Sequence, residues 1–186
     1  MNCFYTAVHV RDDPSLAGLP VAIGGDPAGR GVVAAASYEI QRFGVHSAMP
    51  SARARRLCSQ AVFICPDFPR YWRESETIFA IYRDFTPLVQ AVSIDEAYLD
   101  VSDHLGSWGS ATAVAHEIRR RVREERRLTV SVGVGPNKLV AKIASDFDKL
   151  DGFIVVLLVR VAVFLALLLV RWFYGVGLAT ERALKS

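Results

Sequence analysis

The stretch SIDEAYLDVSD, residues 93–103, places two neighbouring carboxylates, Asp95 and Glu96, within a segment that alternates apolar and polar residues. Such alternation is typical of a half-buried β-strand. Burying a carboxylate without a partner is energetically costly, so the pair requires solvent, a cation or a catalytic role. Adjacent side chains of a strand point to opposite faces of the sheet. Asp95 and Glu96 can therefore serve one site only if the chain bends beside them.

The chemistry of this acid pair favours a hard cation. Carboxylate oxygens gathered at a strand end suit Mg²⁺ or Mn²⁺ better than Zn²⁺, because no softer ligand is near in the sequence. Mg²⁺ typically takes one or two carboxylates and completes its shell with phosphate oxygens and water. From these residues alone, the pair is either such a metal site or a solvated hairpin tip.

Composition allows one compact domain, or one domain plus a fragment, because the chain has 186 residues of which 52% are hydrophobic. The formal net charge of +3 is too small to indicate nucleic-acid binding by itself. Arginines cluster at 53–56 and 119–127, and each cluster alone is typical of a solvated helix face. The three cysteines lack CxxC spacing, which argues against a disulfide framework or a zinc site and fits a cytoplasmic protein. We expect no signal peptide, because no basic segment followed by an apolar run begins the sequence.

The stretch FIVVLLVRVAVFLALLLVRWFY, residues 153–174, is almost wholly apolar and is interrupted by Arg160 and Arg171. Its length alone allows a membrane span. An arginine in mid-span is expensive, at about 2.5–3.5 kcal/mol on insertion scales. We therefore expect a buried strand followed by a buried helix, with a membrane helix as the alternative.

Periodicity predicts the order of elements along the chain. Strands are expected at 3–10, 21–25, 31–37, 61–66, 89–94, 97–101, 129–135 and 153–156. Helices are expected at 50–58, 69–85, 110–127 and 137–147, with a helical turn at 38–43 and Ser110 available to cap the third of these helices. Strand 3–10 and the elements from residue 69 onward predict a mixed sheet backed by two helices, in a split βαβ arrangement. Residues 11–68 would be a small satellite inserted after the first strand.

The acid-pair motif resembles the palm motif of the Y-family DNA polymerases, the lesion-bypass enzymes of DNA polymerase IV type. Further stretches resemble segments of that family in the same order along the chain. These are MNCFYTAVHVRDDPSLAGLPVAIGG (1–25), GVVAAASYEIQRFGVHSAMP (31–50), SVGVGPNKLVAKIASDFDKLDGF (131–153) and GVGLATERAL (175–184). The likeness covers nearly the whole chain, and as a set these motifs are highly specific.

The resemblance implies an α+β fold. A ferredoxin-like palm, with a mixed sheet backed by helices, would carry a small inserted α/β fingers subdomain and a truncated thumb start. The palm would comprise residues 1–10 and 69–160, the fingers 11–68, and the beginning of the thumb 161–186. The little-finger domain of the family would be absent.

The resemblance also assigns a catalytic role to the acid pair. Asp95 would bind the catalytic metal, and Glu96 would complete the site beside the primer 3′-hydroxyl. The backbone carbonyl of Met1 falls where the family supplies a ligand to the nucleotide-bound metal. The cofactor would be two Mg²⁺ ions, or Mn²⁺, about 3.5–4 Å apart.

Five side chains match nucleotide-binding positions of the family. Tyr5 matches the steric gate, whose ring occupies the space that a ribose 2′-hydroxyl would need, and Phe4 would pack beneath the sugar. Tyr38 and Lys149 match the side chains that grip the triphosphate. Gln41 stands where the family usually has a triphosphate-binding arginine. A neutral glutamine cannot supply that charge-assisted bidentate contact, so we expect weaker nucleotide binding.

The sequence departs from the family pattern at its beginning. The family opens with Asp-x-Asp-x-Phe, whereas here Met1 holds the intervening position, Asn2 holds the second aspartate position, and the first aspartate would precede residue 1. The chain as written therefore lacks a ligand shared by both metals. Either the true start lies upstream, which we favour, or the protein is catalytically impaired.

Other departures lie in the fingers and near the carboxyl end. Ala35 replaces a common threonine, and Leu150 replaces the proline usual before Asp-Gly. Residues 157–174 are leucine-rich where the family has prolines and polar residues.

The leading hypothesis is a fragment of a template-directed, Mg²⁺-dependent DNA polymerase for translesion synthesis and DNA repair. Its partners would be primer–template DNA and dNTP, with a sliding clamp reached through a missing carboxy-terminal region; a membrane partner is not favoured. One alternative is a catalytically dead remnant that binds nucleotide or a partner protein. Another is a membrane-associated domain that uses residues 153–174.

Overall fold

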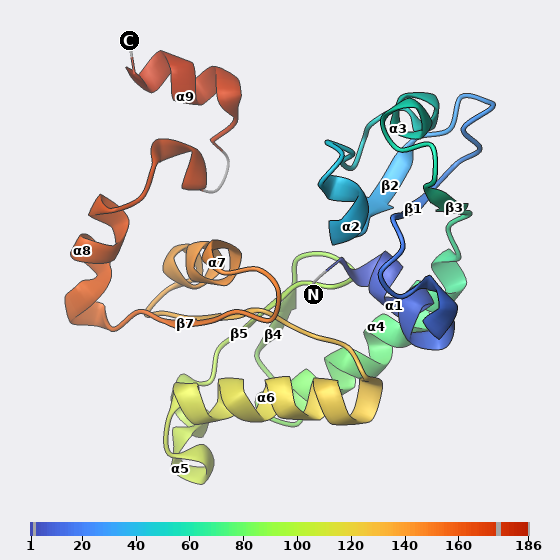
Figure 1. The fold of residues 1–186 in the computed structure, drawn as a ribbon. Coiled ribbons are helices and arrows are strands. Elements are labelled where there is room, and N and C mark those ends of the chain that lie inside the picture. Colours follow the sequence, from blue (N-terminus) through green and yellow to red (C-terminus); the bar gives the residue numbers. More distant parts are fainter. Residues whose placement is uncertain (2, 174–175, 186) are drawn as a thin grey trace. The chain divides into compact units, whose positions relative to one another are not determined.

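The computed structural model describes residue 1, residues 3–173 and residues 176–185. Their contacts divide the chain into two compact units (Figure 1). The first unit comprises Met1, Cys3–Ala80 and Val92–Glu96, and the second comprises residues 81–91 and 97–185.

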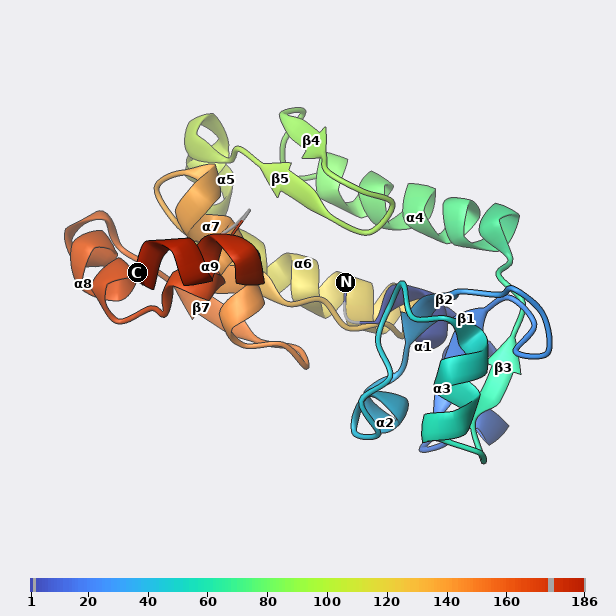
Figure 2. The same ribbon diagram turned by 90° about the horizontal axis from the view of Figure 1, so that it is seen from above.

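A three-stranded sheet with two small helices forms one part of the first unit. Strand β1 (Val21–Gly24) pairs antiparallel with β2 (Val33–Ala36) and parallel with β3 (Val62–Ile64). Helices α2 (Tyr38–Gln41) and α3 (Ser51–Leu57) pack against this sheet (Figure 2). The shared core is built from Ala22, Val33, Ala36, Ile40, Val45, Met49, Ala54, Cys58 and Ala61.

The connection between β1 and β2 depends on glycine. A Cβ atom built on Gly31 would lie 2.3 Å from the backbone carbon of Gly25. No real side chain tolerates that approach, so a glycine is required where the two strands leave their ladder. The strands predicted at 21–25, 31–37 and 61–66 are confirmed, with ends that differ by a few residues.

The opening segment is a helix, α1 (Phe4–Asp12), and the strand predicted at 3–10 is therefore wrong. The N–H group of Ala7 donates to the carbonyl of Cys3 at 2.8 Å, and the N–H group of Asp13 donates to that of His9 at 2.8 Å. Both are the four-residue hydrogen bonds of an α-helix. The apolar residues Phe4 and Val8, one turn apart, are buried on the same face. A short apolar run is compatible with either structure, and the tertiary packing of this face decides for the helix.

Helix α4 (Phe68–Arg83) belongs to the first unit as far as Ala80, and its last residues belong to the second unit. The side chain of Arg11 on α1 forms an ion pair with Glu74 on α4 at 2.7 Å, and both side chains are largely buried. Tyr71, also on α4, is fully buried. The contact between α1 and α4 is therefore both charged and aromatic.

The second unit contains two strand pairs and most of the helices. Strand β4 (Val89–Ala91) pairs antiparallel with β5 (Ala97–Leu99), and β6 (Val132–Val134) pairs parallel with β7 (Phe153–Val155). The helices are α5 (Leu105–Trp108), α6 (Ala111–Arg126), α7 (Lys138–Phe147), α8 (Val161–Ala166) and α9 (Leu178–Lys185). Short 3₁₀ turns lie at Pro14–Leu16 in the first unit and at Ser102–His104, Leu158–Arg160 and Val170–Trp172 in the second. Parallel and antiparallel pairings accompanied by helices confirm the predicted α+β class.

Local capping explains where two of these helices begin. The hydroxyl of Ser110 accepts a hydrogen bond from the N–H group of Ala113 at 3.1 Å, and the side-chain oxygen of Asn137 accepts one from Val140 at 3.0 Å. Both bonds satisfy amide groups that the first helical turn leaves unpaired. The cap predicted at Ser110 is thus confirmed.

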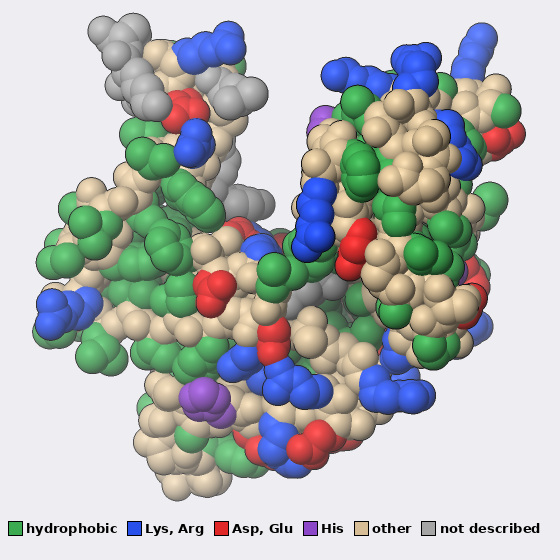
Figure 3. Space-filling view, in the orientation of Figure 1, with side chains coloured by type: hydrophobic (Ala, Val, Ile, Leu, Met, Phe, Trp, Pro, Cys, Tyr) green, Lys and Arg blue, Asp and Glu red, His purple; other side chains and the backbone are tan. Residues whose placement is uncertain are grey.

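The apolar segment that follows β7 is not the buried helix that the sequence predicted. Leu158, Val159 and Leu167 are 75%, 82% and 80% exposed. Only Val161 and Phe164 of α8 pack against the small core that includes Val140, Ala144 and Val156. The segment is broken into a six-residue helix and two 3₁₀ turns, so most of its side chains have no facing element within the described part of the chain. Apolar side chains gather over α8 in Figure 3. Among the described residues, the structure contains no helix with the length and apolarity to cross a membrane.

Candidate active site

The acid pair lies in a tight turn, residues 92–96, that follows β4 in the chain and precedes β5. The N–H groups of Val92 and Ser93 both donate to the carbonyl of Glu96, at 2.8 Å and 3.3 Å. The hydroxyl of Ser93 donates to a carboxylate oxygen of Asp95 at 2.9 Å. The chain therefore bends beside the acids, as convergence on one site requires.

This turn is fastened to α4 and to the start of the sequence. The buried hydroxyl of Ser75 on α4 donates to the carbonyl of Ile94 at 2.5 Å. The amino group of Met1 donates to the carbonyl of Asp95 at 3.0 Å and lies 3.5 Å from its carboxylate. The Asp95 side chain is 24% exposed, so it is held by the protein and still reachable from solvent.

The donor set here suits a hard divalent cation held jointly with a ligand. Within the described residues, no group of three or more His, Cys, Asp and Glu side chains could hold a metal ion. Two adjacent carboxylates nevertheless meet the protein's usual share of a Mg²⁺ site, since phosphate oxygens and water supply the remaining ligands. Asp95 and Glu96 fit that share.

Tyr5 lies in the same neighbourhood, on the first turn of α1. Its ring stacks on that of Tyr71, with centroids 4.2 Å apart and an angle of 14° between the planes, and it meets Phe68 edge to face. Burial raises the pKa of the Tyr5 hydroxyl, and the negative charge of Asp95 raises it further. Phe4 is buried, with its ring centroid 5.8 Å from that of Tyr5. The structure therefore brings together the predicted steric gate, its neighbour Phe4 and one predicted metal ligand.

Tyr38 and Gln41 meet the start of α1 through Cys3. Burial raises the pKa of the Tyr38 hydroxyl well above its usual value, and the Cys3 thiol adds to this effect. The side-chain amide of Gln41 donates to the carbonyl of Ala36 at 2.9 Å and to the Cys3 sulfur at 3.6 Å. The amide of Gln41 thus donates to groups of the protein itself, and its weak contact with a nucleotide stays a prediction.

Lys149 belongs to the second unit and follows α7. Its ammonium group pairs with Asp146 at 2.6 Å, and its side chain is 41% exposed. Because the described contacts place Lys149 in the other unit, its contact with a nucleotide at the acid pair stays a prediction.

Sequence reasoning missed two residues that pack beside the predicted site, Tyr71 and His9. The ring of Tyr71 stacks against that of Tyr5, and the Tyr71 hydroxyl lies 2.8 Å from Nε2 of His9. The available signal was the aromatic spacing of Phe68 and Tyr71 at the start of α4, which marks a buried aromatic face but names no partner.

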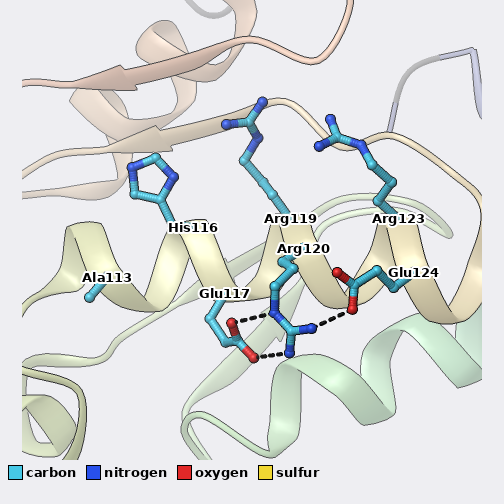
Figure 4. Close-up of a pocket in the computed structure, with 7 residues that line it drawn as sticks. All are labelled: Ala113, His116, Glu117, Arg119, Arg120, Arg123 and Glu124. Atoms are coloured by element: carbon cyan, nitrogen blue, oxygen red, sulfur yellow. Dashed lines mark hydrogen bonds and ion pairs between the residues drawn. The ribbon is translucent and has the colours of Figure 1, made fainter.

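A second candidate, a hollow of about 590 Å³, lies along α6 in the second unit (Figure 4). Figure 4 shows Arg120 between Glu117 and Glu124, to both of which it is hydrogen-bonded. The Arg120 hydrogen bond lowers the pKa of Glu117. His116 and Arg119 lie against the ring of Phe153. The charges of Arg120, Glu117 and Glu124 satisfy one another, while Arg119 and Arg123 pair with Asp151 outside the hollow. The residues that line the hollow therefore offer no catalytic group comparable with the acid pair.

Comparison with known proteins identifies the family. The family model described as "impB/mucB/samB family" matches residues 1–146. The chain belongs to the impB/mucB/samB family. Relatives include the DNA polymerase IV of Alkalilimnicola ehrlichii, 54% identical over 185 residues that cover 100% of this chain and 52% of that protein. The DNA polymerase IV of Ralstonia nicotianae is 50% identical over 184 residues, covering 99% and 52%.

Solved structures agree with this membership of the impB/mucB/samB family. DinB from Sulfolobus solfataricus has a TM-score of 0.93 and 30% identity, over 99% of this chain and 54% of that one. A structure described as a Y-family DNA polymerase chimera, Dbh-Dpo4(243-245)-Dbh, has a TM-score of 0.92 and 30% identity, over 99% and 55%. The resemblance to Y-family polymerases is thereby confirmed. The chain spans about half the length of the relatives that it matches.

Proposed function

We propose that these 186 residues form the palm, the fingers and the first part of the thumb of a lesion-bypass DNA polymerase. The reaction is template-directed transfer of a nucleotide from dNTP to a primer 3′-hydroxyl, in translesion synthesis. The observation that carries the proposal is the turn at Asp95 and Glu96 in a chain of the impB/mucB/samB family. The charge of Asp95 in this turn raises the pKa of the Tyr5 hydroxyl, and the Tyr5 ring is stacked on Tyr71. A relative in this fold is described as an insertion ternary complex of Dbh DNA polymerase, with a TM-score of 0.90, which supports DNA and dNTP as partners here.

The proposed boundaries follow the sequence: palm at 1–10 and 69–160, fingers at 11–68 and the thumb start at 161–186. The sheet of β1, β2 and β3 supports the fingers, because all its strands and the core that covers them lie inside 11–68. The pairing of β4 with β5, the strands that precede and follow the acid turn in the chain, supports the palm.

In this proposal the residues of the first unit that match the family's site have defined tasks. Asp95, oriented by the Ser93 hydroxyl, and Glu96 hold Mg²⁺ together with the backbone carbonyl of Met1. When bound, the two ions supply charge neutralisation on the triphosphate and activation of the primer hydroxyl. The ring of Tyr5 fills the space of a ribose 2′-hydroxyl, and Phe4 supports it from the core of α1.

The remaining contacts concern the triphosphate. Tyr38 and Lys149 bind its oxygens, while Gln41 contributes less than the usual arginine because its amide is engaged at Ala36. A second candidate function, nucleotide binding without turnover, is favoured by this engaged amide and by the lack of a third clustered acid among the described residues.

Primer extension tests the proposal on the protein encoded by the complete reading frame that contains these residues. Asp95→Asn and Glu96→Gln should each lower the Mg²⁺-dependent extension rate at least about 100-fold, the loss typical of removing a group that stabilises transition-state charge. The exposed Asp103, substituted as Asp103→Asn, is the matched control and should keep the rate. Unchanged extension by Asp95→Asn would refute the catalytic assignment. Nucleotide binding with no extension by the unsubstituted protein would support the second candidate.

A further inference from the structure

His9 occupies a buried position on α1 that no predicted role explains. Its side chain faces two residues of α4 at once. Nε2 lies 2.8 Å from the hydroxyl of Tyr71, and Nδ1 lies 3.4 Å from a guanidinium nitrogen of Arg70. The His9 ring also meets the Tyr71 ring nearly edge to face, with centroids 5.7 Å apart and an angle of 77°.

These two contacts fix the protonation of the imidazole. A guanidinium group only donates hydrogen bonds, so Nδ1 must present its lone pair to Arg70. The proton of the neutral ring is then on Nε2, which donates to the Tyr71 hydroxyl. Imidazolium would direct a second N–H group at the guanidinium cation.

The surrounding charges favour the neutral ring. Burial lowers the pKa of His9, and Arg70 lowers it further, against the opposing effect of Asp67 and Asp12. Arg70 is itself held in place, since its Nε donates to a carboxylate oxygen of Asp12 at 3.0 Å and its backbone N–H donates to Asp67 at 3.1 Å.

The consequence concerns the placement of Tyr71. His9 holds the hydroxyl of this fully buried residue, and the face of the same ring carries Tyr5 at 4.2 Å. A ring held by its hydroxyl cannot slide within its plane without losing that bond. The stacked Tyr5 ring is therefore held in register with Tyr71.

We propose that His9, as the neutral Nε2–H tautomer, is a positioning residue that fixes the Tyr5 ring through Tyr71 and so sharpens discrimination against ribonucleotides. The discrimination rests on the proposed function. The tautomer and the placement of Tyr5 do not depend on it.

Nuclear magnetic resonance of the 186-residue chain tests the geometry directly. At neutral pH, the ¹⁵N signals of His9 should show a protonated Nε2 and an unprotonated Nδ1. His9→Phe keeps the ring shape and removes both hydrogen-bonding nitrogens, so the ring signals of Tyr5 should shift. His9→Gln keeps a hydrogen-bond donor and an acceptor, so the ring signals of Tyr5 should stay at their original positions. A protonated Nδ1, or Tyr5 signals unmoved by His9→Phe, would overturn the proposal.

Ribonucleotide incorporation by the complete protein tests the consequence. His9→Phe should reduce the preference for dNTP over rNTP between about twofold and about tenfold, the range that corresponds to one neutral hydrogen bond. His9→Gln should restore most of the preference. His46→Phe, at an exposed histidine of the same unit, is the matched control and should leave it unchanged. Unaltered preference in His9→Phe, or no restoration by a folded His9→Gln, would overturn the positioning role.

The two experiments separate the two proposals. If the unsubstituted complete protein extends no primer, the proposed function fails, while the NMR measurements still decide whether His9 positions Tyr5.

Discussion

Substitution of Arg11 should destabilise the contact between α1 and α4 more than substitution of any exposed arginine. Arg11 pairs with Glu74 at 2.7 Å, and the two side chains are 11% and 5% exposed. Arg11→Met would leave the Glu74 carboxylate in its buried position without this cation. Water cannot readily reach the Glu74 carboxylate to solvate it in place of the guanidinium group.

The expected magnitude follows from this burial. Removing one partner of a buried ion pair costs about 3–5 kcal/mol, because the other charge remains desolvated. A typical domain has a free energy of unfolding of about 5–15 kcal/mol. With a loss of about 4 kcal/mol and a urea dependence of about 2 kcal/mol per M, the denaturation midpoint should fall by about 2 M. Urea unfolding followed by far-ultraviolet circular dichroism measures this shift.

Two further variants make this measurement decisive. Arg120→Met removes a cation that pairs with Glu117 and Glu124 on the exposed face of α6, so its midpoint should not change measurably. The double variant Arg11→Met/Glu74→Leu removes both buried charges and should recover most of the loss. Equal denaturation midpoints for Arg11→Met and Arg120→Met, or a double variant less stable than Arg11→Met, would contradict the assigned contribution of the buried ion pair.

Three other predictions concern single positions. Gly152→Ala should destabilise the second unit by at least about 1–3 kcal/mol, because the new Cβ would lie 1.7 Å from the carbonyl oxygen of Asp148. Gly106→Ala should not destabilise it, because no atom lies within 4 Å of the new Cβ there. Thermal melting compares the two. Ser110→Ala should cost about 1 kcal/mol in urea unfolding through loss of the α6 cap, and Ser110→Asp should restore it. Since folding lowers the pKa of His9, its contribution to stability is complete above the unfolded value of about 6.5 and is lost as pH falls through the folded value. His9→Phe should therefore show a flatter decline in melting temperature over that range, and an equally steep decline would exclude His9 as the cause.

Much of the fold was predictable because it is encoded in short stretches. The helical periodicity of apolar residues over 110–127 and the cap at Ser110 specify α6 without reference to the rest of the chain. The turn between β1 and β2 needs glycine at Gly31 for local steric reasons. The bend beside Asp95 is likewise local, since it is closed by hydrogen bonds among residues 92–96.

Two predictions failed where the local pattern is ambiguous. The segment Phe4–Asp12 has the composition of a strand, but the burial of Phe4 and Val8 on one side and the ion pair from Arg11 favour a helix. The apolar run after β7 suggested a buried helix, yet within α8 only Val161 and Phe164 pack against the small core around Val140, and Leu158, Val159 and Leu167 stay exposed. In both cases the deciding partner is distant in sequence, and hydropathy does not report it.

The order of most elements, the cap at Ser110 and the acid pair at a bend could be predicted from local sequence, because each depends on the conformational preferences of neighbouring residues. Three contacts depend on tertiary packing: Tyr5 stacks on Tyr71, His9 is hydrogen-bonded to the Tyr71 hydroxyl, and the Gln41 amide donates to the carbonyl of Ala36. The contact of His9 with Tyr71 joins residues 62 positions apart. Such contacts form only when packing brings two buried surfaces together, so their geometry depends on side chains that no local pattern couples.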